Sequence, residues 1–467
     1  KNKSLDIVKK LTKEGFNALF TGGAVRDMVI GFEPADFDIV TNAPCEDIFR
    51  IFAGAGEKVK KAGKTFAVCL VNDIDVASCR SDSSDSYTAK GTTIVSEEKT
   101  STSEGTTSFP ECDLAHRDIT INSMAFDPLS GFLIDPFGGR KDLAKKIIRF
   151  TGNPEHRIAE DPLRMVRACR FVSWLQGEFA HTTLLSIINN RHLVVEKIAP
   201  ERIRYEIVKA MSHKKPSHFF RALHITGLLE LILPSLSRCA DLDGGPHHGE
   251  TVLEHCLLSG DALSPRKPIL RLAGYLHDAG KYDTATIKDG HITFPDHEKM
   301  GKAVIRDLQN LRFSNEEIKF VDAVINTHMR PLTPDSTPKA VRRLLAFLKA
   351  HDISWQTFMQ MRIADKAANL AKYPYKPEDI RLRVDKIWQE LKNRKINGCA
   401  SHPLSILDLD ITGNDIMKIL DIPSGYKVGQ IINYLFEQVL DNPDLNNFES
   451  LKKMLHLLYN NNCRANF

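Results

Sequence analysis

Residues 19–41, LFTGGAVRDMVIGFEPADFDIVT, contain the feature that most constrains how this chain folds. A short apolar run leads into a glycine pair, and AVRDMVI then predicts a helix that ends at Gly31, where helices commonly turn left-handed. A turn leads from there into an Asp-Phe-Asp triplet and a strand. Because strand side chains alternate between faces, we expect Asp36 and Asp38 to share one face while Phe37 enters a core.

The same stretch combines two kinds of group that nucleotide chemistry needs. Two carboxylates about 7 Å apart repel each other unless a cation lies between them. The glycine pair, Gly22 and Gly23, can bring backbone N–H groups close to a phosphate at a helix N-terminus. A tight turn followed by a strand with a solvated acidic face would also explain these residues. The combination of glycines and spaced acids favours a nucleotidyl-transfer site instead.

The motif GGAVRD, followed nine residues later by DFD, resembles the head motif of a known superfamily. This superfamily contains the class II tRNA nucleotidyltransferases (CCA-adding enzymes) and the bacterial poly(A) polymerases. The resemblance implies an α+β fold, in which a small mixed-sheet nucleotidyltransferase head precedes a mostly α-helical neck, HD domain and tail. It also implies that phosphates are held by Gly22, Gly23 and Arg26 and that Mg²⁺ is held by Asp36 and Asp38.

A third acid and a polar segment follow this motif. Two strands are predicted at residues 66–71 and 74–78, joined by a polar hairpin turn. Asp75 lies in the second strand, where it resembles the third catalytic carboxylate of the superfamily, although a hairpin surface acid would fit equally. Residues 81–113 hold 15 Ser and Thr among 33 residues, which predicts a mobile excursion at the place of the superfamily's flexible loop.

The segment DLAHRDITINSMAFD contains an Arg-Asp pair that resembles the ribose-recognising pair of the superfamily. An arginine donor and an acidic acceptor, here Arg117 and Asp118, can both engage a ribose 2′-hydroxyl. By itself the pair could equally be a surface ion pair. Residues 119–127 show alternation that predicts a strand.

RIAEDPLRMVRACRF resembles the superfamily's templating motif. Asp161, with Glu160 and Pro162, is predicted to begin a helix, and Arg164 lies one turn further on. Cytosine and adenine both present an exocyclic amine beside a ring-nitrogen acceptor, so a carboxylate and a guanidinium can select them without a template strand. An intrahelical salt bridge is the alternative. Further arginines complete a predicted nucleotide-binding stripe: Arg167 and Arg170. ERIRYEIVKAM resembles the neck motif that braces this helix.

The second half of the chain carries histidines and acids in helical contexts, in an order that resembles the HD phosphohydrolase superfamily. They are predicted to bind metal: His255, His277, Asp278, His297, His328 and Asp365. Imidazole ligands suit a transition metal such as Ni²⁺, Co²⁺ or Mn²⁺, whereas the all-oxygen set of the head suits Mg²⁺.

Length and composition shifts suggest four domains. We expect a head at 1–146, a helical neck at 147–236, an HD domain at 237–378 and a helical tRNA-binding tail at 379–467. Residues 140–215 carry 16 Lys and Arg against 8 Asp and Glu, which suggests a polyanionic partner. Nine cysteines without Cys-x-x-Cys pairs, no membrane-length apolar run and no signal peptide favour a reducing cytoplasm.

We therefore expect a template-independent nucleotidyltransferase that uses CTP and ATP to add or repair the 3′-CCA end of tRNA. The HD domain would add a metal-dependent phosphohydrolase activity. A CC-adding or A-adding specialist and a bacterial poly(A) polymerase are alternatives within the superfamily. A signalling-nucleotide hydrolase and a non-catalytic RNA chaperone are alternatives outside it. The sequence leaves the oligomeric state open.

Overall fold

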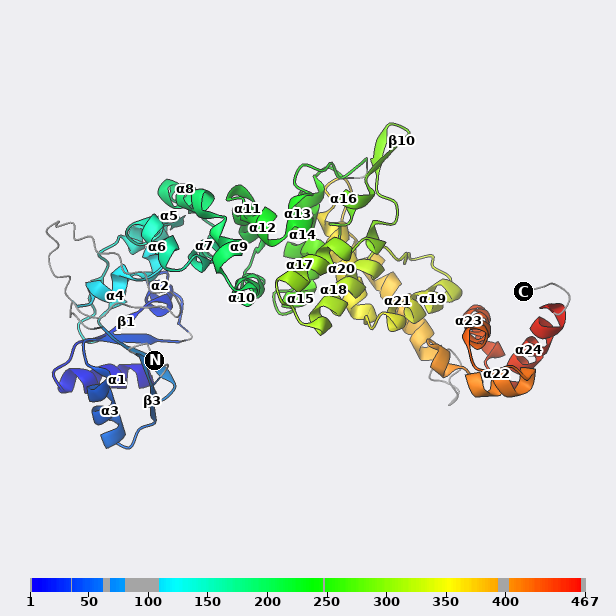
Figure 1. The fold of residues 1–467 in the computed structure, drawn as a ribbon, viewed down its shortest axis with the longest axis horizontal. Coiled ribbons are helices and arrows are strands. Elements are labelled where there is room, and N and C mark those ends of the chain that lie inside the picture. Colours follow the sequence, from blue (N-terminus) through cyan, green and yellow to red (C-terminus); the bar gives the residue numbers. More distant parts are fainter. Residues whose placement is uncertain are drawn as a thin grey trace. The chain divides into compact units, whose positions relative to one another are not determined.

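The computed structural model describes residues 2–34, 36–61, 68–79, 109–246, 248–393 and 403–462. It divides into two compact units (Figure 1). The N-terminal unit comprises Lys1–Glu206 and His218–Leu231, and the C-terminal unit comprises Ile207–Ser217 and Ile232–Phe467. The predicted division into four domains is finer than this partition and stays a prediction.

The N-terminal unit is built on a seven-stranded sheet with the order β3-β4-β5-β2-β1-β6-β7. Strands β2 and β5 are parallel, whereas the other neighbouring strands are antiparallel, so the sheet is mixed, as the sequence predicts. The strands are β1 (Ala18–Thr21), β2 (Asp38–Thr41), β3 (Val59–Lys61), β4 (Val68–Val71), β5 (Ile74–Ser78), β6 (Ala125–Phe126) and β7 (Leu133–Ile134).

Five helices accompany the sheet: α1 (Asn2–Lys13), α2 (Gly23–Val29), α3 (Cys45–Gly54), α4 (Glu111–Ala115) and α5 (Gly139–Lys145). Helices α1 and α3 contact each other and the sheet (Figure 1). Each buries one apolar face, with Leu11 of α1 and Phe52 of α3 fully buried. The chain leaves α2 through Gly31 at φ +80°, which confirms the predicted left-handed end.

The hairpin between β4 and β5 is also confirmed. Asn72 and Asp73 form its turn, and both have positive φ, which matches the right-handed twist of the flanking strands. Strand β2 begins at Asp38, so Asp36 precedes the strand, but the predicted alternation of faces holds. Phe37 is buried, whereas both aspartates are exposed. Most of the predicted loop at 81–113 lies outside the described residues.

The predicted strand at 119–127 is wrong over most of its length. Residues Thr120–Asn122 form a 3-10 helix, Ile119 forms an isolated β-bridge with Phe150, and Ala125–Phe126 form the short strand β6. Polar side chains compete with strand pairing here. The side chain of Asp118 accepts from the N–H of Ile119, and the hydroxyl of Ser123 donates to the carbonyl of Ile119.

Helices form the rest of this unit. They are α6 (Pro154–Glu160), α7 (Leu163–Leu175), α8 (His181–Asn190), α9 (Leu193–Lys197), α10 (Pro200–Ala210), α11 (Ser217–Ile225) and α12 (Leu228–Ile232). Strands β8 (Ile147–Ile148) and β9 (Glu178–Phe179) pair in parallel beside them. The prediction that Glu160 and Asp161 form the first turn of a helix is wrong: Glu160 ends α6, and Asp161 is extended and is separated by Pro162 from α7, which begins at Leu163.

The C-terminal unit is almost entirely helical in its described residues. Its helices are α13 (Pro234–Ser237), α14 (Val252–Ala262), α15 (Pro268–Leu276), α16 (Lys281–Thr284), α17 (Lys302–Asn310), α18 (Asn315–Thr327), α19 (Pro338–Ala350), α20 (Trp355–Ala368), α21 (Pro377–Asn393), α22 (Gly413–Leu420), α23 (Tyr426–Asp441) and α24 (Phe448–Asn462). A hairpin of β10 (Thr286–Lys288) and β11 (His291–Thr293) interrupts them. None of the helices described is long and apolar enough to span a membrane.

Two of the cysteines are paired, which differs from what a reducing compartment, favoured by the cysteine pattern, would lead us to expect. Cys79, directly after β5, forms a disulfide with Cys112 of α4. Cys79 also packs against a small core around Leu19 and Leu114. Strand β5 and helix α4, which precede and follow residues 80–108 in the sequence, therefore lie close together. Among the other described cysteines, Cys45, Cys169, Cys239 and Cys256 carry free thiols.

Candidate functional site

Acidic side chains meet at the start of strands β2 and β5. The parallel register pairs Ile39 with Val76, so the preceding residues, Asp38 and Asp75, lie side by side. Asp36, Asp38 and Asp75 are all exposed. Although Asp38 keeps contact with solvent, partial desolvation by the surrounding residues raises its pKa, as do the charges of Asp75 and Asp36, whereas the charge of Arg117 opposes this rise. The structure therefore brings the three predicted carboxylates together.

Gly22 lies directly beside these acids, in the turn before α2. Its φ of +71° is in the left-handed region, which favours glycine. A Cβ atom at this position would lie 2.7 Å from Nη1 of Arg117 and 3.3 Å from Oδ2 of Asp38. The backbone conformation therefore favours glycine at 22, and a side chain there would displace the guanidinium of Arg117 from its place beside Asp38. A Cβ atom added at Gly23, the first residue of α2, would make only ordinary van der Waals contacts with the guanidinium of Arg26.

Arg117 reaches this site because Asp113 holds it. Nε of Arg117 donates to Oδ2 of Asp113 at 2.9 Å, one helical turn earlier. Asp113 was not among the residues singled out from the sequence. An acid four residues before an arginine on a helix is the signal that could have identified it.

Arg26 is held by neighbouring side chains. Its guanidinium donates to Oδ1 of Asp27 and, at 2.9 Å, to Oδ1 of Asn122. It also lies over the ring of Trp174, 4.0 Å from the ring centroid. These contacts link the glycine turn to α7, which carries Trp174.

Asp118 is buried and forms an ion pair with α7. Its Oδ2 accepts from Nε of Arg167 at 2.9 Å, and its Oδ1 accepts from the N–H of Ile119 and from Asn122. Although burial opposes ionisation, Arg167 and these hydrogen bonds hold the pKa of Asp118 below its ordinary value. Arg117 and Asp118 thus face different neighbours, since Arg117 faces the acids and Asp118 faces α7.

Asp161 and Arg164 each have their own partners. Asp161 accepts from both terminal nitrogens of Arg202 on α10, at 3.1 and 2.7 Å. Arg164 pairs with Glu160 and donates to the carbonyls of Arg157 and His116, the latter at 3.1 Å. The intrahelical salt bridge considered as an alternative is therefore not the arrangement of these two side chains.

Arg170 differs from the other arginines of the predicted stripe because it is buried. It forms an ion pair with Glu206 of α10, and both side chains are less than a tenth exposed. Its guanidinium also lies over the ring of Phe171. Arg164 and Arg167 are partly exposed. Two arginine–acid pairs, Asp161–Arg202 and Arg170–Glu206, thus connect the α7 segment to α10.

A second group of titratable side chains lies in the C-terminal unit. Asp278, directly after α15, is its centre: Oδ1 is 3.1 Å from Nε2 of His297 and 3.4 Å from Nε2 of His328. Its Oδ2 is 3.4 Å from Nε2 of His277 and 3.6 Å from Nε2 of His255. Asp365 of α20 completes the group, with Oδ1 3.0 Å from Nε2 of His255. All six residues predicted to bind metal are therefore brought together.

Three of these histidines are fixed in one orientation by the backbone. Nδ1 of His277, His297 and His328 lies within hydrogen-bond distance of the carbonyl three residues earlier. Their buried Nε2 atoms lie near Asp278 but form no well-aligned hydrogen bond within the described residues. Burial lowers the pKa of His277 to about 3, so its imidazole is neutral and Nε2 can act as a ligand.

The donor set of this cluster fits a divalent transition metal. Converging imidazole nitrogens and carboxylate oxygens, in groups whose ligand atoms lie within 4.8 Å of one another, are the ligands such ions prefer. Lys281 was not among the residues singled out, although its motif HDAGK was visible in the sequence. Its Nζ lies 2.7 Å from Oδ2 of Asp278. Although burial opposes ionisation, His277 and Lys281 hold the pKa of Asp278 well below its ordinary value.

Three family models match separate parts of the chain. The "Poly A polymerase head domain" matches residues 18–149. The "Probable RNA and SrmB- binding site of polymerase A" matches residues 178–239. A "tRNA nucleotidyltransferase domain 2" model matches residues 297–455. Residues 18–149 and 297–455 of this chain thus resemble parts of RNA nucleotidyltransferases.

Individual relatives agree with these matches. A CCA-adding enzyme of Ligilactobacillus salivarius is 28% identical over 466 residues, which is 97% of this chain and 96% of that protein. One from Geobacillus stearothermophilus is 35% identical over 236 residues, which is 50% of this chain and 55% of that protein. The crystal structure of a Bacillus stearothermophilus CCA-adding enzyme in complex with CTP covers 99% of this chain and 98% of its own, with a TM-score of 0.64 and 22% identity. This similarity confirms the predicted fold class.

Proposed function

We propose that this chain is a tRNA nucleotidyltransferase, because separate parts of it match models of the poly(A) polymerase head and of a tRNA nucleotidyltransferase domain and because CCA-adding enzymes are among its relatives. It adds or repairs the 3′-terminal CCA of tRNA, using CTP and ATP without a template strand. The observation that carries this function is the row of Asp36, Asp38 and Asp75 beside the Gly22 turn. A relative named as a CCA-adding enzyme that aligns over almost the whole chain supports the choice of activity.

The catalytic residues are the three carboxylates. Their oxygen-only donor set fits Mg²⁺, and the clustering of like charges around Asp38 favours a bound cation. Mg²⁺ held there would supply positive charge to the triphosphate and lower the pKa of the terminal 3′-hydroxyl of tRNA. Gly22, Gly23 and Arg117 lie beside the acids, where they can contact the phosphates and ribose.

Arg26 and Asp118 support the site through contacts with other side chains. Arg26 and Asp118 both contact Asn122, and Asp118 in turn holds Arg167. This chain of contacts joins the glycine turn to α7, the helix of the templating motif. We therefore assign positioning roles to Arg26, Asp118 and Arg167. In this assignment they affect the nucleotide indirectly, through the neighbouring residues that they hold in place.

Base selection is assigned to Asp161 and Arg164. A carboxylate oxygen of Asp161 accepts from the exocyclic amine of cytosine or adenine, and Arg164 donates to the ring nitrogen. Uracil and guanine present donor and acceptor in the reverse order. Arg202 supports this assignment because its two hydrogen bonds fix the plane of the Asp161 carboxylate.

The specificity is tested with tRNAs that end at the discriminator base, at C or at CC. Each is incubated with CTP, ATP or both, and the products are resolved at single-nucleotide length. A CCA-adding enzyme completes all three substrates and stops. A CC-adding or A-adding specialist completes only part of the sequence, and a poly(A) polymerase extends RNA with ATP alone.

The carboxylate assignment is tested with Asp38→Ala. We expect nucleotide incorporation to fall below a few per cent of wild type while tRNA binding stays nearly intact. Asp73→Ala is the matched control, because Asp73 is an exposed acid in the nearby hairpin whose partner is Lys58. Substantial incorporation by Asp38→Ala would contradict the assignment.

A second activity is favoured by the histidine cluster of the C-terminal unit. Buried Nε2 atoms of His277, His297 and His328 converge on Asp278, which supports a metal-dependent phosphohydrolase of the HD type. His255 and Asp365 would complete the ligand set, and Ni²⁺, Co²⁺ or Mn²⁺ are the metals that suit it. The substrates we propose are cyclic phosphates and 2′-phosphates on damaged RNA ends. Assays with 2′,3′-cyclic, 2′- and 3′-phosphates under each metal test this activity, and inactivity on all three would exclude it.

A further inference from the structure

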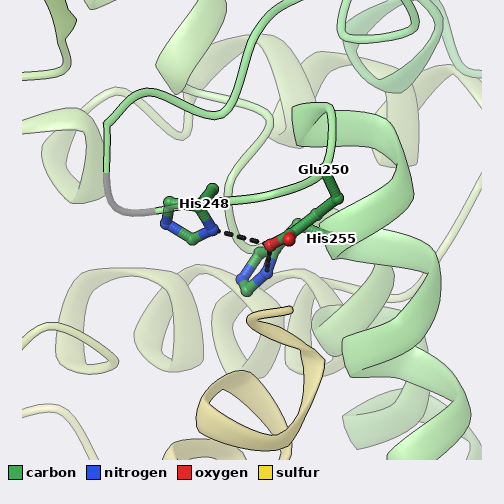
Figure 2. A group of neighbouring side chains, drawn as sticks. All are labelled: His248, Glu250 and His255. Carbon is green, nitrogen blue, oxygen red and sulfur yellow. Dashed lines mark hydrogen bonds and ion pairs between the residues drawn. The ribbon is translucent and has the colours of Figure 1, made fainter. Parts of the chain in front are cut away.

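Glu250 is a buried carboxylate that the proposed activities do not yet use. It lies two residues before α14, and its side chain is about 1% exposed. Figure 2 shows it between two imidazole rings. Its Oε1 is 2.8 Å from Nδ1 of His248 and 3.1 Å from Nδ1 of His255.

The other oxygen of Glu250 is held by the backbone. Oε2 accepts from the N–H of Gly249 at 2.9 Å and from the N–H of Leu370 at 3.0 Å. Leu370 follows α20, the helix that carries Asp365. These bonds fix the carboxylate relative to both α14 and α20, so its Oε1 is aimed at His255 by the fold itself.

His255 needs such a partner because of its place in the chain. His277 and His328 lie at the C-terminal ends of helices, where backbone carbonyls are left without intrahelical partners and can accept from Nδ1. His255 lies in the first turns of α14, where the neighbouring carbonyls are committed to the helix. A side chain from outside the helix must therefore accept from its Nδ1, and Glu250 does so.

The result is a common orientation of the ring nitrogens. With Nδ1–H donated to Glu250, the lone pair of His255 is on Nε2, which lies 3.0 Å from Asp365 and 3.6 Å from Asp278. A histidine that donates one N–H to a carboxylate while the other nitrogen binds metal is a common arrangement in metalloproteins. Without the acceptor, Nε2–H would donate to Asp365 and the ligand atom would be lost.

We propose that Glu250 is the positioning carboxylate of the second site: it holds His255 in the tautomer that presents Nε2 to a divalent metal. This inference rests on the proposed metal site of the C-terminal unit. His248 donates to the same oxygen and packs edge-on against His255, with 4.7 Å between ring centroids, so it closes the outer side of the carboxylate. His248 is a partner of the carboxylate and not a ligand.

Cobalt titration of the full chain tests the proposal. Visible absorption of Co²⁺ bound by imidazole nitrogen, read in competition with a chelator, reports the second site and not the all-oxygen head. Glu250→Gln keeps the shape and removes the charge and one acceptor, so we expect about 10-fold to 100-fold weaker binding. Asp307→Asn is the matched control, because it neutralises a buried carboxylate whose partner is the N–H of Ser235. It should leave Co²⁺ affinity unchanged.

A second readout separates positioning from general stability. Nitrogen-15 NMR of histidine side chains in the metal-free protein reports which ring nitrogen carries the proton. Wild-type His255 should carry it on Nδ1, and Glu250→Gln should move it towards Nε2. A loss of stability alone would not change the tautomer of the folded protein.

The outcomes distinguish this proposal from the one on which it rests. Wild type that binds no Co²⁺ would exclude the metal site and, with it, the role of Glu250. Wild type that binds Co²⁺ while Glu250→Gln binds within twofold as tightly would exclude only the positioning role. If Glu250→Gln fails to fold, the wild-type spectrum still decides, since a proton on Nε2 of His255 would overturn the proposal.

Discussion

Asp161 retains one acceptor site after its contacts are counted. A carboxylate offers about four lone pairs. Oδ1 accepts from Arg202 and from the N–H of Leu163, whereas Oδ2 accepts only from Arg202 among the described residues. One lone pair on Oδ2 is therefore available for an exocyclic amine. The carboxylate is held rigidly by the same contacts that leave this site open.

We predict that Asp161→Ala and Arg164→Ala relax base selection as well as slow addition. Each substitution removes one discriminating hydrogen bond, worth about 1–3 kcal/mol. Incorporation of UTP and GTP should rise relative to CTP and ATP, measured by single-nucleotide extension of tRNA ending at the discriminator base. Glu155→Ala, on the preceding helix, should keep selection. Variants that slow equally with all four nucleotides would show that the pair is structural.

The local placement of single side chains was the part of the site that could be predicted best from the sequence. The alternation of Asp36, Phe37 and Asp38 follows from strand geometry and was confirmed. The convergence of His277 and Asp365 was predicted only from resemblance, since 88 residues and several helices separate them. Glu250 escaped prediction because its role depends on a backbone N–H at Leu370, which no local pattern reveals.

Helix α2 and the hairpin of β4 and β5 were predicted correctly, because a glycine and a polar turn mark where these elements end. Elements were predicted poorly where polar side chains bond to the backbone. Residues 119–127 alternate like a strand, but Asp118 and Ser123 take local hydrogen bonds that turn the chain into a 3-10 helix. Similarly, Asp161 separates two helices because its side chain caps the N–H of Leu163.

Helix α7 is fixed to α10 by the buried pair of Arg170 and Glu206. Removing one partner of a buried ion pair leaves an uncompensated charge. We therefore predict that Glu206→Gln destabilises the N-terminal unit by about 3–5 kcal/mol. Fluorescence of Trp174 during urea unfolding, with Trp355 and Trp388 replaced by phenylalanine, reports this unit alone.

The same variant tests how Arg170 acts. If it positions α7, Glu206→Gln should lower incorporation of CTP and ATP together, in proportion to the loss of structure. Asp47→Asn is the control, since it breaks an exposed pair with Arg50 and should change stability by less than about 1 kcal/mol. Unchanged stability of Glu206→Gln would show that the buried pair does not hold the helix.

At the scale of the whole molecule, the two units carry ligand sets of different chemistry. The acids of the head lie in the N-terminal unit, and the histidine cluster lies in the C-terminal unit. Oxygen ligands suit Mg²⁺, whereas imidazole-rich sets suit transition metals. This difference predicts two activities that respond separately to mutation and to metal supply.

We predict that His277→Ala and Asp278→Ala abolish phosphohydrolase activity and leave nucleotide addition near wild type. The reason is that Asp36, Asp38 and Asp75 form a complete carboxylate row without any residue of the C-terminal unit. Both activities are assayed on each variant, and on wild type with Mg²⁺ or Ni²⁺ as the only added ion. Mg²⁺ alone should support addition, and Ni²⁺ should support hydrolysis.

His351→Ala is the matched control for these variants. His351 also lies at the end of a helix and bonds through Nδ1 to a backbone carbonyl, that of Phe347, but it belongs to no ligand group among the described residues. Its removal should spare both activities. Loss of nucleotide addition in a folded His277→Ala protein would contradict the separation, because it would mean that the histidine cluster contributes to the chemistry of the head.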